Sequence, residues 1–321
     1  VKVGASMLGV AWLDFPRRGF IMVSGEGPGT VIGPGFVVQH CGSNQGAWQY
    51  YIRSHPGTKL ARSTDWYQGG GFLIQGTTMK GPVLDGVLVR KCSAIFGGGM
   101  FVDSAHVQLK NVSLHQCGRE HGPGIFVSGK VFLTWENGRV IDSTTWASGA
   151  IYVAAWSNYA TLSFVGVSFE NNIQRSHNIH VTYENYHSGS ALSVADDEGT
   201  SRVVDISFRR CLFLRNVARQ KGGAVYLSKK VKTALFEECV FVGNRAPFGG
   251  DDVYIKEGVG NGAVRIVDAK VQVSDFQKDS NGVGRSGFAM ENVHAVAQCE
   301  SALLEKNVCP SSGDRCVNRP A

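Results

Sequence analysis

Two groups of carboxylates in this sequence have the residue types that catalysis would need. Residues 196–198 read Asp-Asp-Glu and residues 251–252 read Asp-Asp, and clustered carboxylates can transfer protons or bind a divalent cation. When the chain is aligned on the repeat described below, residues 196 and 197 fall level with Lys229 and Lys230. Charges that alternate in this way avoid repulsion between neighbouring solvent-facing strands. We therefore expect ion pairs with these lysines and assign no catalytic residue; a lyase or hydrolase acting on polysaccharides is the alternative.

A second group of chemically suited residues lies in the stretch 173–188. This stretch contains three histidines and two tyrosines: His177, His180, Tyr183, Tyr186 and His187. Three histidines could hold a zinc ion, but a polar, aromatic loop that contacts a partner explains the same composition. Because the chain contains no Cys-x-x-Cys pair, we expect no structural zinc, and we expect no other metal and no cofactor.

The elements that would position these residues repeat along the chain. A glycine-rich corner recurs at intervals of 25 to 41 residues, at Gly70, Gly98, Pro123, Gly149, Ser190, Gly223 and Asp251. The residues two and four places after each corner are all apolar, which is the alternation of a strand with one buried face. Insertions at 173–188 and 196–201 lengthen two of the intervals, and we expect both to form surface loops.

A second strand recurs within the same repeat. Its buried column reads Val89, Leu114, Ile141, Phe169, Phe213 and Phe241. Three residues further on, the column reads Cys92, Cys117, Thr144, Asn172, Asn216 and Asn244. We expect these three asparagines to be structural corner residues, because asparagine tolerates a left-handed backbone and bonds its own turn. Their stacked amides could also bond one another along the axis.

Two short strands and a corner in each repeat, without helical periodicity between them, predict an all-β fold. The fold expected is a right-handed parallel β-helix, in which equivalent residues of successive coils stack about 4.8 Å apart. We expect irregular early coils or a cap over residues 1–68 and the regular β-helix over 69–275. Residues 276–321 would form a terminal coil and the start of a Cys-rich module.

One column of the first strand should point outward, and we name it the aromatic stripe. It consists of Leu73, Phe101, Phe126, Tyr152, Tyr226 and Tyr254, interrupted by Ser193. Stacked at the coil spacing, these side chains would make a continuous apolar surface of the kind that marks an interaction site. We predict that the aromatic stripe contacts a protein or glycan partner, unless the loop 173–188 or a neighbouring segment covers it.

Seven of the eight cysteines are candidates for disulfide bonds. Neighbouring coils would bring two pairs within bonding range, although a buried free thiol would also pack well. The pairs are Cys92 with Cys117 and Cys211 with Cys239, and the remaining candidates are Cys299, Cys309 and Cys316. Because the last three crowd the end of the chain, they indicate an oxidising compartment. The sequence Asn111-Val-Ser113 is in addition a candidate site of N-glycosylation.

The pairing of a Gly-Gly-Ala-aliphatic strand with a Phe-x-x-Asn strand resembles the repeats of polymorphic outer-membrane proteins, which are surface adhesins of the autotransporter type. It is similar also to the repeats of pectin-lyase-like β-helices in large eukaryotic surface proteins. The matching segments are Gly222–Val225, Phe213–Asn216 and Phe241–Asn244, with looser matches at 98–99, 149–150 and 169–172. The resemblance covers residues 70–255 and implies a β-helical surface protein, but not an activity, because this fold carries both enzymes and inert scaffolds. Cysteines replace the asparagine in two coils, which favours a eukaryotic protein.

Composition and charge narrow the class of protein. The net charge is +6, and lysine and arginine are scattered along the sequence, so we expect no nucleic-acid partner. No apolar run is long enough to span a membrane. Residues 1–10 lack the order of a signal peptide, so the chain reads as a mature or excised fragment. We predict a non-catalytic structural or adhesive ectodomain at the cell surface or outside the cell, with extracellular proteins or glycans as partners.

Overall fold

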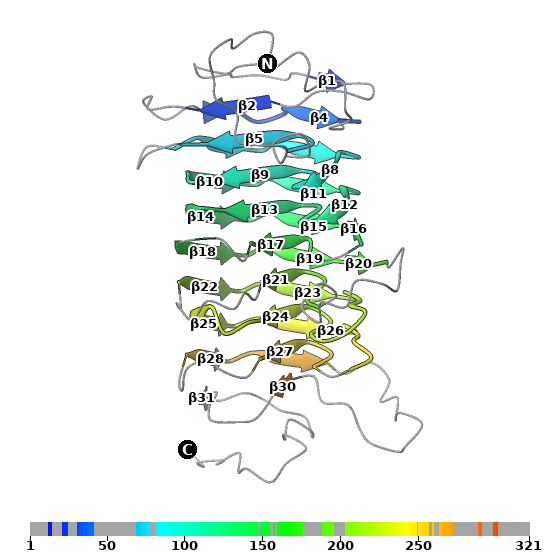
Figure 1. Ribbon diagram of the computed structural model, residues 1–321, viewed down its shortest axis with the longest axis vertical. Helices are drawn as coiled ribbons and strands as arrows, with labels where there is room; N and C mark the ends of the chain where they lie inside the picture. The colour runs from blue at the N-terminus through cyan, green and yellow to red at the C-terminus, as the bar shows by residue number, and fades with distance from the viewer. Residues whose placement is uncertain are drawn as a thin grey trace.

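The computed structural model shows a parallel β-helix, in which the chain winds coil upon coil along one long axis (Figure 1). It describes residues 12–14, 21–24, 31–41, 69–76, 81–146, 148–154, 157, 159–175, 188–195, 203–248, 250–256, 259, 263–272, 288–290 and 298–300. The described residues contain strands but no helix, and therefore no helix that could span a membrane. The predicted fold class, an all-β parallel β-helix, is confirmed.

Three parallel sheets of nine strands each, which we name A, B and C, form the walls of the β-helix. Sheet A contains β2 (Ile21–Ser24), β5 (Phe72–Gln75), β9 (Met100–Asp103), β13 (Ile125–Ser128), β17 (Ile151–Val153), β21 (Leu192–Val194), β24 (Val225–Leu227), β27 (Val253–Ile255) and β30 (Phe288–Met290). Sheet B contains β3 (Val31–Ile32), β6 (Val83–Asp85), β10 (His106–Lys110), β14 (Lys130–Glu136), β18 (Tyr159–Val165), β22 (Val204–Arg209), β25 (Val231–Glu237), β28 (Val264–Val267) and β31 (Gln298–Glu300). Sheet C contains β1 (Trp12–Asp14), β4 (Val37–Gln39), β7 (Leu88–Arg90), β11 (Ser113–His115), β15 (Arg139–Ile141), β19 (Ser168–Glu170), β23 (Leu212–Leu214), β26 (Val240–Val242) and β29 (Lys270–Gln272).

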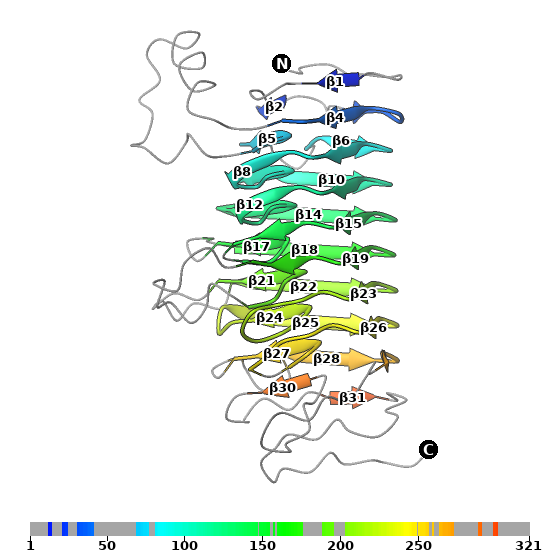
Figure 2. The same cartoon turned by 90° about the vertical axis from the view of Figure 1, so that its right-hand side faces the viewer.

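A fourth sheet, D, occupies only the middle of the molecule. It contains β8 (Ser93–Phe96), β12 (Gly118–His121), β16 (Thr144–Thr145) and β20 (Ile173–Gln174). In these coils the chain passes from sheet B to sheet C, then through sheet D to sheet A (Figure 2). The two strands recognised in the sequence are those of sheets A and C, whereas the strands of sheets B and D were not predicted.

The register of sheet A is the one that the glycine corners predict. Phe72 pairs with Met100, and the same column continues through Ile125, Ile151, Leu192, Val225 and Val253. In sheet C the expected column is wrong by one residue in one coil, because Val140, not Ile141, pairs with Leu114 and Phe169. Ser143, three residues after Val140, consequently occupies the position equivalent to Asn172 at which Thr144 was expected. Val140 is fully buried and Ile141 is half-buried, so burial distinguishes two residues that look alike in the sequence.

The interior is filled by apolar side chains that stack on their equivalents in the next coil. The ring of Phe213 lies 5.0 Å from that of Phe169 and 4.7 Å from that of Phe241, each pair nearly coplanar. A parallel stack runs from Phe164 through Phe208 to Phe236 on sheet B. Burial of these rings removes much apolar surface from water, which is the main force that stabilises such a fold.

The corners of the coils are made by single residues with a left-handed backbone. The corner before sheet A uses glycine, and at Gly222 (φ 63°) a Cβ atom would lie 2.2 Å from the carbonyl oxygen of Val225. The corner after sheet C accepts larger residues, including Asn171 and Arg215. The left-handed position is thus one residue before Asn172 and Asn216, which corrects the expectation that these asparagines adopt it themselves.

Candidate functional site

The aromatic stripe lies on the outer side of sheet A, but it is not exposed. Its most accessible member, Leu73, is 8% exposed, and Phe126 is completely buried. With Ala154 and Ala195, four members of the aromatic stripe form a cluster separate from the main core: Leu73, Phe101, Phe126 and Tyr152. The prediction of a continuous exposed contact surface is therefore wrong.

Aromatic residues of sheet D explain part of this burial. The ring of Phe96 packs edge-on against Phe126 at 4.9 Å, and His121 lies 5.4 Å from Tyr152. Farther along the axis, the Nζ atom of Lys221 sits 4.7 Å from the centre of the Tyr254 ring. Over Phe126 and Tyr152, the covering segment that the sequence left as an alternative is thus a strand of sheet D. This part of the stripe forms a second, smaller core.

The three asparagines after sheet C form a buried hydrogen-bonded ladder along the axis. The Nδ2 atom of Asn172 donates to Oδ1 of Asn216 at 3.0 Å, and Nδ2 of Asn216 donates to Oδ1 of Asn244 at 2.9 Å. Each Oδ1 also accepts the backbone N–H of the asparagine one coil earlier, at 3.2 Å for Asn172 and 2.9 Å for Asn216. The amides bond one another and the backbone, so they hold successive coils in register.

The ladder ends on a buried carboxyl group. Nδ2 of Asn244 donates to Oδ1 of Asp252 at 2.8 Å. Burial raises the pKa of Asp252 to about 7, although the hydrogen bond from Asn244 opposes this shift. The neighbouring Asp251 accepts the backbone N–H of Ala246 at 2.7 Å. Asp252 therefore does not belong to a solvent-facing row of carboxylates, and its inaccessibility argues against contact with a substrate; residues 196–198 lie outside the described residues.

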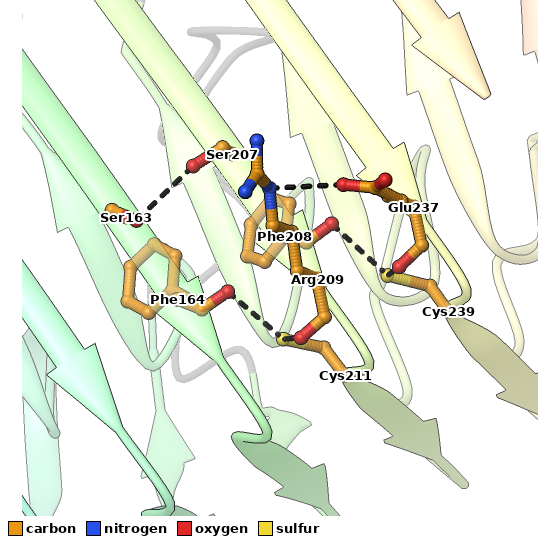
Figure 3. A network of polar contacts seen from close by, with 8 residues as sticks. All are labelled: Ser163, Phe164, Ser207, Phe208, Arg209, Cys211, Glu237 and Cys239. Carbon is orange, nitrogen blue, oxygen red and sulfur yellow. Dashed lines mark hydrogen bonds and ion pairs between the residues drawn. The ribbon is translucent and has the colours of Figure 1, made fainter. Parts of the chain in front are cut away.

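Both predicted cysteine pairs consist of buried free thiols, so neither is a disulfide. In Figure 3, Cys211 donates to the carbonyl oxygen of Phe164 at 3.5 Å and Cys239 to that of Phe208 at 3.4 Å. The hydrogen bond with Cys211, together with burial, raises the pKa of Cys239. Burial likewise raises the pKa of Cys117. The thiols of Cys117 and Cys239 therefore stay protonated, and all four cysteines fill the interior as small buried groups.

The remaining candidates are the glycosylation site, the loop residues and the C-terminal cysteines, and the structure describes only some of them. Asn111 is exposed at a corner (φ 52°), and its Nδ2 atom donates to Oδ1 of Asp85 at 2.9 Å; glycosylation there stays a prediction. The loop residues His177, His180, Tyr183, Tyr186 and His187 lie outside the described residues, as do Cys309 and Cys316. Cys299 lies on β31, but its side chain is not described. Within the described residues, no three His, Cys, Asp or Glu side chains gather as a metal site would require.

The outer face of sheet B presents a cluster of partly exposed rings that the sequence reading missed. His106 stacks on Phe132 with ring centres 4.2 Å apart, and Tyr159 packs against the same ring at 5.7 Å. All three are half-buried, and Nζ of the exposed Lys130 lies 5.8 Å from the Phe132 ring. Partial burial, with a smaller contribution from Lys130, lowers the pKa of His106, so this ring is neutral at neutral pH. We name these three rings the ring cluster.

Polar groups continue this face beyond the ring cluster. The hydroxyl of Tyr159 donates to Oδ2 of Asp205 at 3.3 Å, and the hydroxyl of Thr233 donates to Oδ1 at 2.5 Å. Ser207 donates to Ser163 at 3.2 Å (Figure 3). The alternation of buried and accessible residues in 130–136 could have revealed this face, had sheet B been aligned.

The edge of sheet B next to sheet C carries a column of alternating charge. Successive strands place Asp85, Lys110 and Glu136 level with one another, and two coils further on Arg209 pairs with Glu237 at 2.9 Å (Figure 3). Such a column stabilises neighbouring strands by small amounts at exposed positions. Alternating charge of the kind expected for residues 196–198, which lie outside the described residues, is thus present on sheet B.

Comparison with known proteins assigns neither a family nor a function to this chain. No protein-family model, no curated protein and no solved structure matches this chain. The specific repeat type suggested by the Gly-Gly-Ala and Phe-x-x-Asn segments therefore rests on the residues alone, and a functional proposal must come from the surface itself.

Proposed function

We propose that the chain is a non-catalytic, structural or adhesive ectodomain that acts outside the cell or at its surface. The observation that carries this proposal is the outer face of sheet B, where the ring cluster adjoins serine, threonine and aspartate side chains. Partly exposed aromatic rings surrounded by polar groups are typical of residues that contribute strongly to binding. A rigid β-helix would present this face without ordering a loop on contact, which favours affinity.

The carboxylate on this face supports binding rather than proton transfer. Both oxygens of Asp205 accept hydrogen bonds from hydroxyl groups, and Nζ of Lys232 lies 3.9 Å from Oδ2. These contacts fix the orientation of the carboxylate, which suits a polar contact with a partner.

The repeat pattern supports the proposed location. The Gly-Gly-Ala and Phe-x-x-Asn segments resemble those of β-helical surface proteins, and here they build the corner before sheet A and the asparagine ladder. The partners that we propose are extracellular proteins or glycans, and Asn111 is the proposed point of glycan attachment.

The ring cluster can be tested by binding. We expect the wild-type protein to bind at least one member of an immobilised panel of extracellular-matrix proteins and neutral glycans. We expect Phe132→Ala combined with Tyr159→Ala to weaken that binding at least tenfold. Leu212→Ala is the matched control, because Leu212 is equally half-buried on the outer face of another sheet. Equal binding by the wild type and the double variant would overturn the assignment of this face, and release of new sugar ends from a glycan would establish an enzyme instead.

A further inference from the structure

Four exposed arginines gather at the corner that follows sheet C in the C-terminal half of the β-helix. They are Arg175, Arg215, Arg219 and Arg245, and we name this set the arginine corner. It lies along the edge that β20 marks in Figure 1. Because the sequence separates these residues by as many as 70 positions, from 175 to 245, only the winding of the chain brings them together.

The backbone pairing places the four arginines on three consecutive coils. Ile173 is bridged to Val217, and Val217 to Arg245. The N–H of Gln174 donates to Val217 and that of Ala218 donates to Arg245, both at 2.9 Å. Arg175 is therefore level with Arg219, about one coil spacing of 4.8 Å away.

The alternation of side chains settles which way the arginines point. Gln174, Ala218 and Ala246 are buried, whereas the residues on either side of them are half-buried or exposed. The side chains of Arg175 and Arg219 thus form one outward column, and Arg245 belongs to the adjacent column. Arg215 adopts a left-handed conformation (φ 51°) at the same corner, where its N–H donates to Val242 at 2.8 Å.

Like charges are placed level with one another here, at Arg175 and Arg219. In the described part of the chain, none of the four guanidinium groups forms an ion pair. Identical charges directly opposite each other on neighbouring strands are destabilising, and the same molecule avoids this arrangement in its alternating column at Asp85, Lys110 and Glu136. An arrangement that costs stability in the free protein is explained if an anionic partner supplies the missing negative charge.

An exposed phenylalanine adjoins the arginines. Phe248 is 70% exposed and is the only exposed large apolar side chain among the described residues. Its N–H donates to the carbonyl oxygen of Gln220 at 2.9 Å, next in sequence to Arg219. The corner therefore offers both positive charge and one apolar surface.

We propose that the arginine corner binds a linear anionic polysaccharide that carries carboxylate or sulfate groups. Guanidinium groups form paired hydrogen bonds with the two oxygens of such anions. Positive charges repeated along the axis at the coil spacing match a chain that carries negative charges at regular intervals. A folded protein partner fits less well, because protein interfaces require a buried, largely apolar centre, whereas here one apolar side chain accompanies four charges.

This proposal is independent of the ring cluster, which lies on the outer face of sheet B. The overall charge of +6 would in addition favour the approach of a polyanion. If the protein is an adhesive surface domain, the arginine corner would be a second contact site of different specificity.

The decisive variant is Arg175→Gln combined with Arg219→Gln. Its matched control is Arg139→Gln combined with Arg210→Gln, which removes the same charge from two exposed arginines elsewhere. The probes are heparin, desulfated heparin and polygalacturonate, with double-stranded DNA and poly-L-glutamate as competing polyanions. In 150 mM salt, we expect heparin or polygalacturonate to bind the wild type, the decisive variant to bind at least tenfold more weakly, and the control to differ less than twofold.

The outcomes separate the sources of negative charge and the competing explanations. Binding that is lost on desulfation identifies sulfate as the recognised group, and binding to polygalacturonate identifies carboxylate. An equal loss in the control variant would show that bulk charge alone attracts the polyanion and would overturn the proposal. The proposal would also be overturned if DNA or poly-L-glutamate bound as tightly as the polysaccharides and with the same dependence on Arg175 and Arg219. A wild-type protein that bound none of the polysaccharides would overturn it too. Because Phe132→Ala with Tyr159→Ala should leave heparin binding unchanged, failure at one surface is distinguishable from failure at the other.

Discussion

Replacing Asp252 by asparagine should remove a pH dependence from the stability of this β-helix. Asp252 is buried at the end of the asparagine ladder, where Oδ1 accepts the Nδ2–H of Asn244 at 2.8 Å. Burial raises its pKa from 3.8 to about 7, so the folded protein prefers the neutral acid. An asparagine at this position could accept the same hydrogen bond without ever carrying charge.

The direction of the effect follows from the two pKa values. Because the pKa in the folded state is the higher one, the stabilisation from the protonated group is fully present below pH 3.8 and is lost as the pH rises through about 7. A difference of about 3 pKa units corresponds to about 4 kcal/mol. The wild type should therefore lose up to about 4 kcal/mol from this group between pH 4 and pH 8, whereas Asp252→Asn should lose none of it.

The assay is urea unfolding of both proteins at intervals from pH 4 to pH 8. The quantity that decides is the difference in unfolding free energy between variant and wild type, since contributions from the other titrating groups cancel in that difference. We expect this difference to move in favour of Asp252→Asn from about pH 4 to about pH 7 and to level off above pH 7. Hydrogen exchange at the backbone N–H of Asn216, which donates to Asn244 at 2.9 Å, should report the same trend locally.

A matched control is Asp142→Asn, which changes an exposed carboxylate at a left-handed corner (φ 54°) that asparagine also tolerates. This control should follow the wild type at every pH. A difference between Asp252→Asn and wild type that stays constant from pH 4 to pH 8 would refute the reasoning, because Asp252 would then have no raised pKa in the folded protein.

Three further substitutions test the packing. Tyr254→Ala should lower the unfolding free energy by about 3 kcal/mol, because Tyr254 is 5% exposed and stacks on Tyr226 at 5.8 Å; unchanged urea unfolding would show that the ring is exposed after all. Gly138→Ala should cost about 2 kcal/mol and shift the indole N–H resonance of Trp135, since the new Cβ atom would lie 1.8 Å from Nε1 of that ring; an unshifted resonance would contradict this packing. Asn216→Leu should cost at least about 2 kcal/mol in urea unfolding, because buried donors one coil earlier lose their acceptor, and a cost below about 0.5 kcal/mol, typical of a surface substitution, would argue against the ladder.

The register of the β-helix was predictable because burial imposes a period of two on each strand. In sheet A the column from Phe72 to Val253 follows directly from the glycine corners. The one error in sheet C arose because Val140 and Ile141 are both β-branched and apolar, so that a shift by one residue leaves the pattern intact. Only the pairing of Val140 with Leu114 shows which of them points inward.

The fate of the aromatic stripe was not predictable from the same alternation. Alternation correctly places Phe126 and Tyr152 on the outer side of their strands, but it does not reveal what lies over them. Phe96 and His121 reach this side from short strands of sheet D. Those strands are two to four residues long, which is too short for an alternation of apolar and polar residues to reveal them.

The sequence by itself determined the repeat, the inward columns and the asparagines that bond along the axis, because each depends on spacing within one coil or on the offset between successive coils. The tertiary structure alone decided which residues become lateral neighbours. It covered the middle of the aromatic stripe with residues of sheet D, placed Asp252 at the end of the asparagine ladder, and aligned Arg175 with Arg219. The physical reason is that these residues are far apart in the sequence and come into contact only across coils or between neighbouring sheets. Which of them meet depends on where each coil turns, and those positions are fixed only when the coils have stacked.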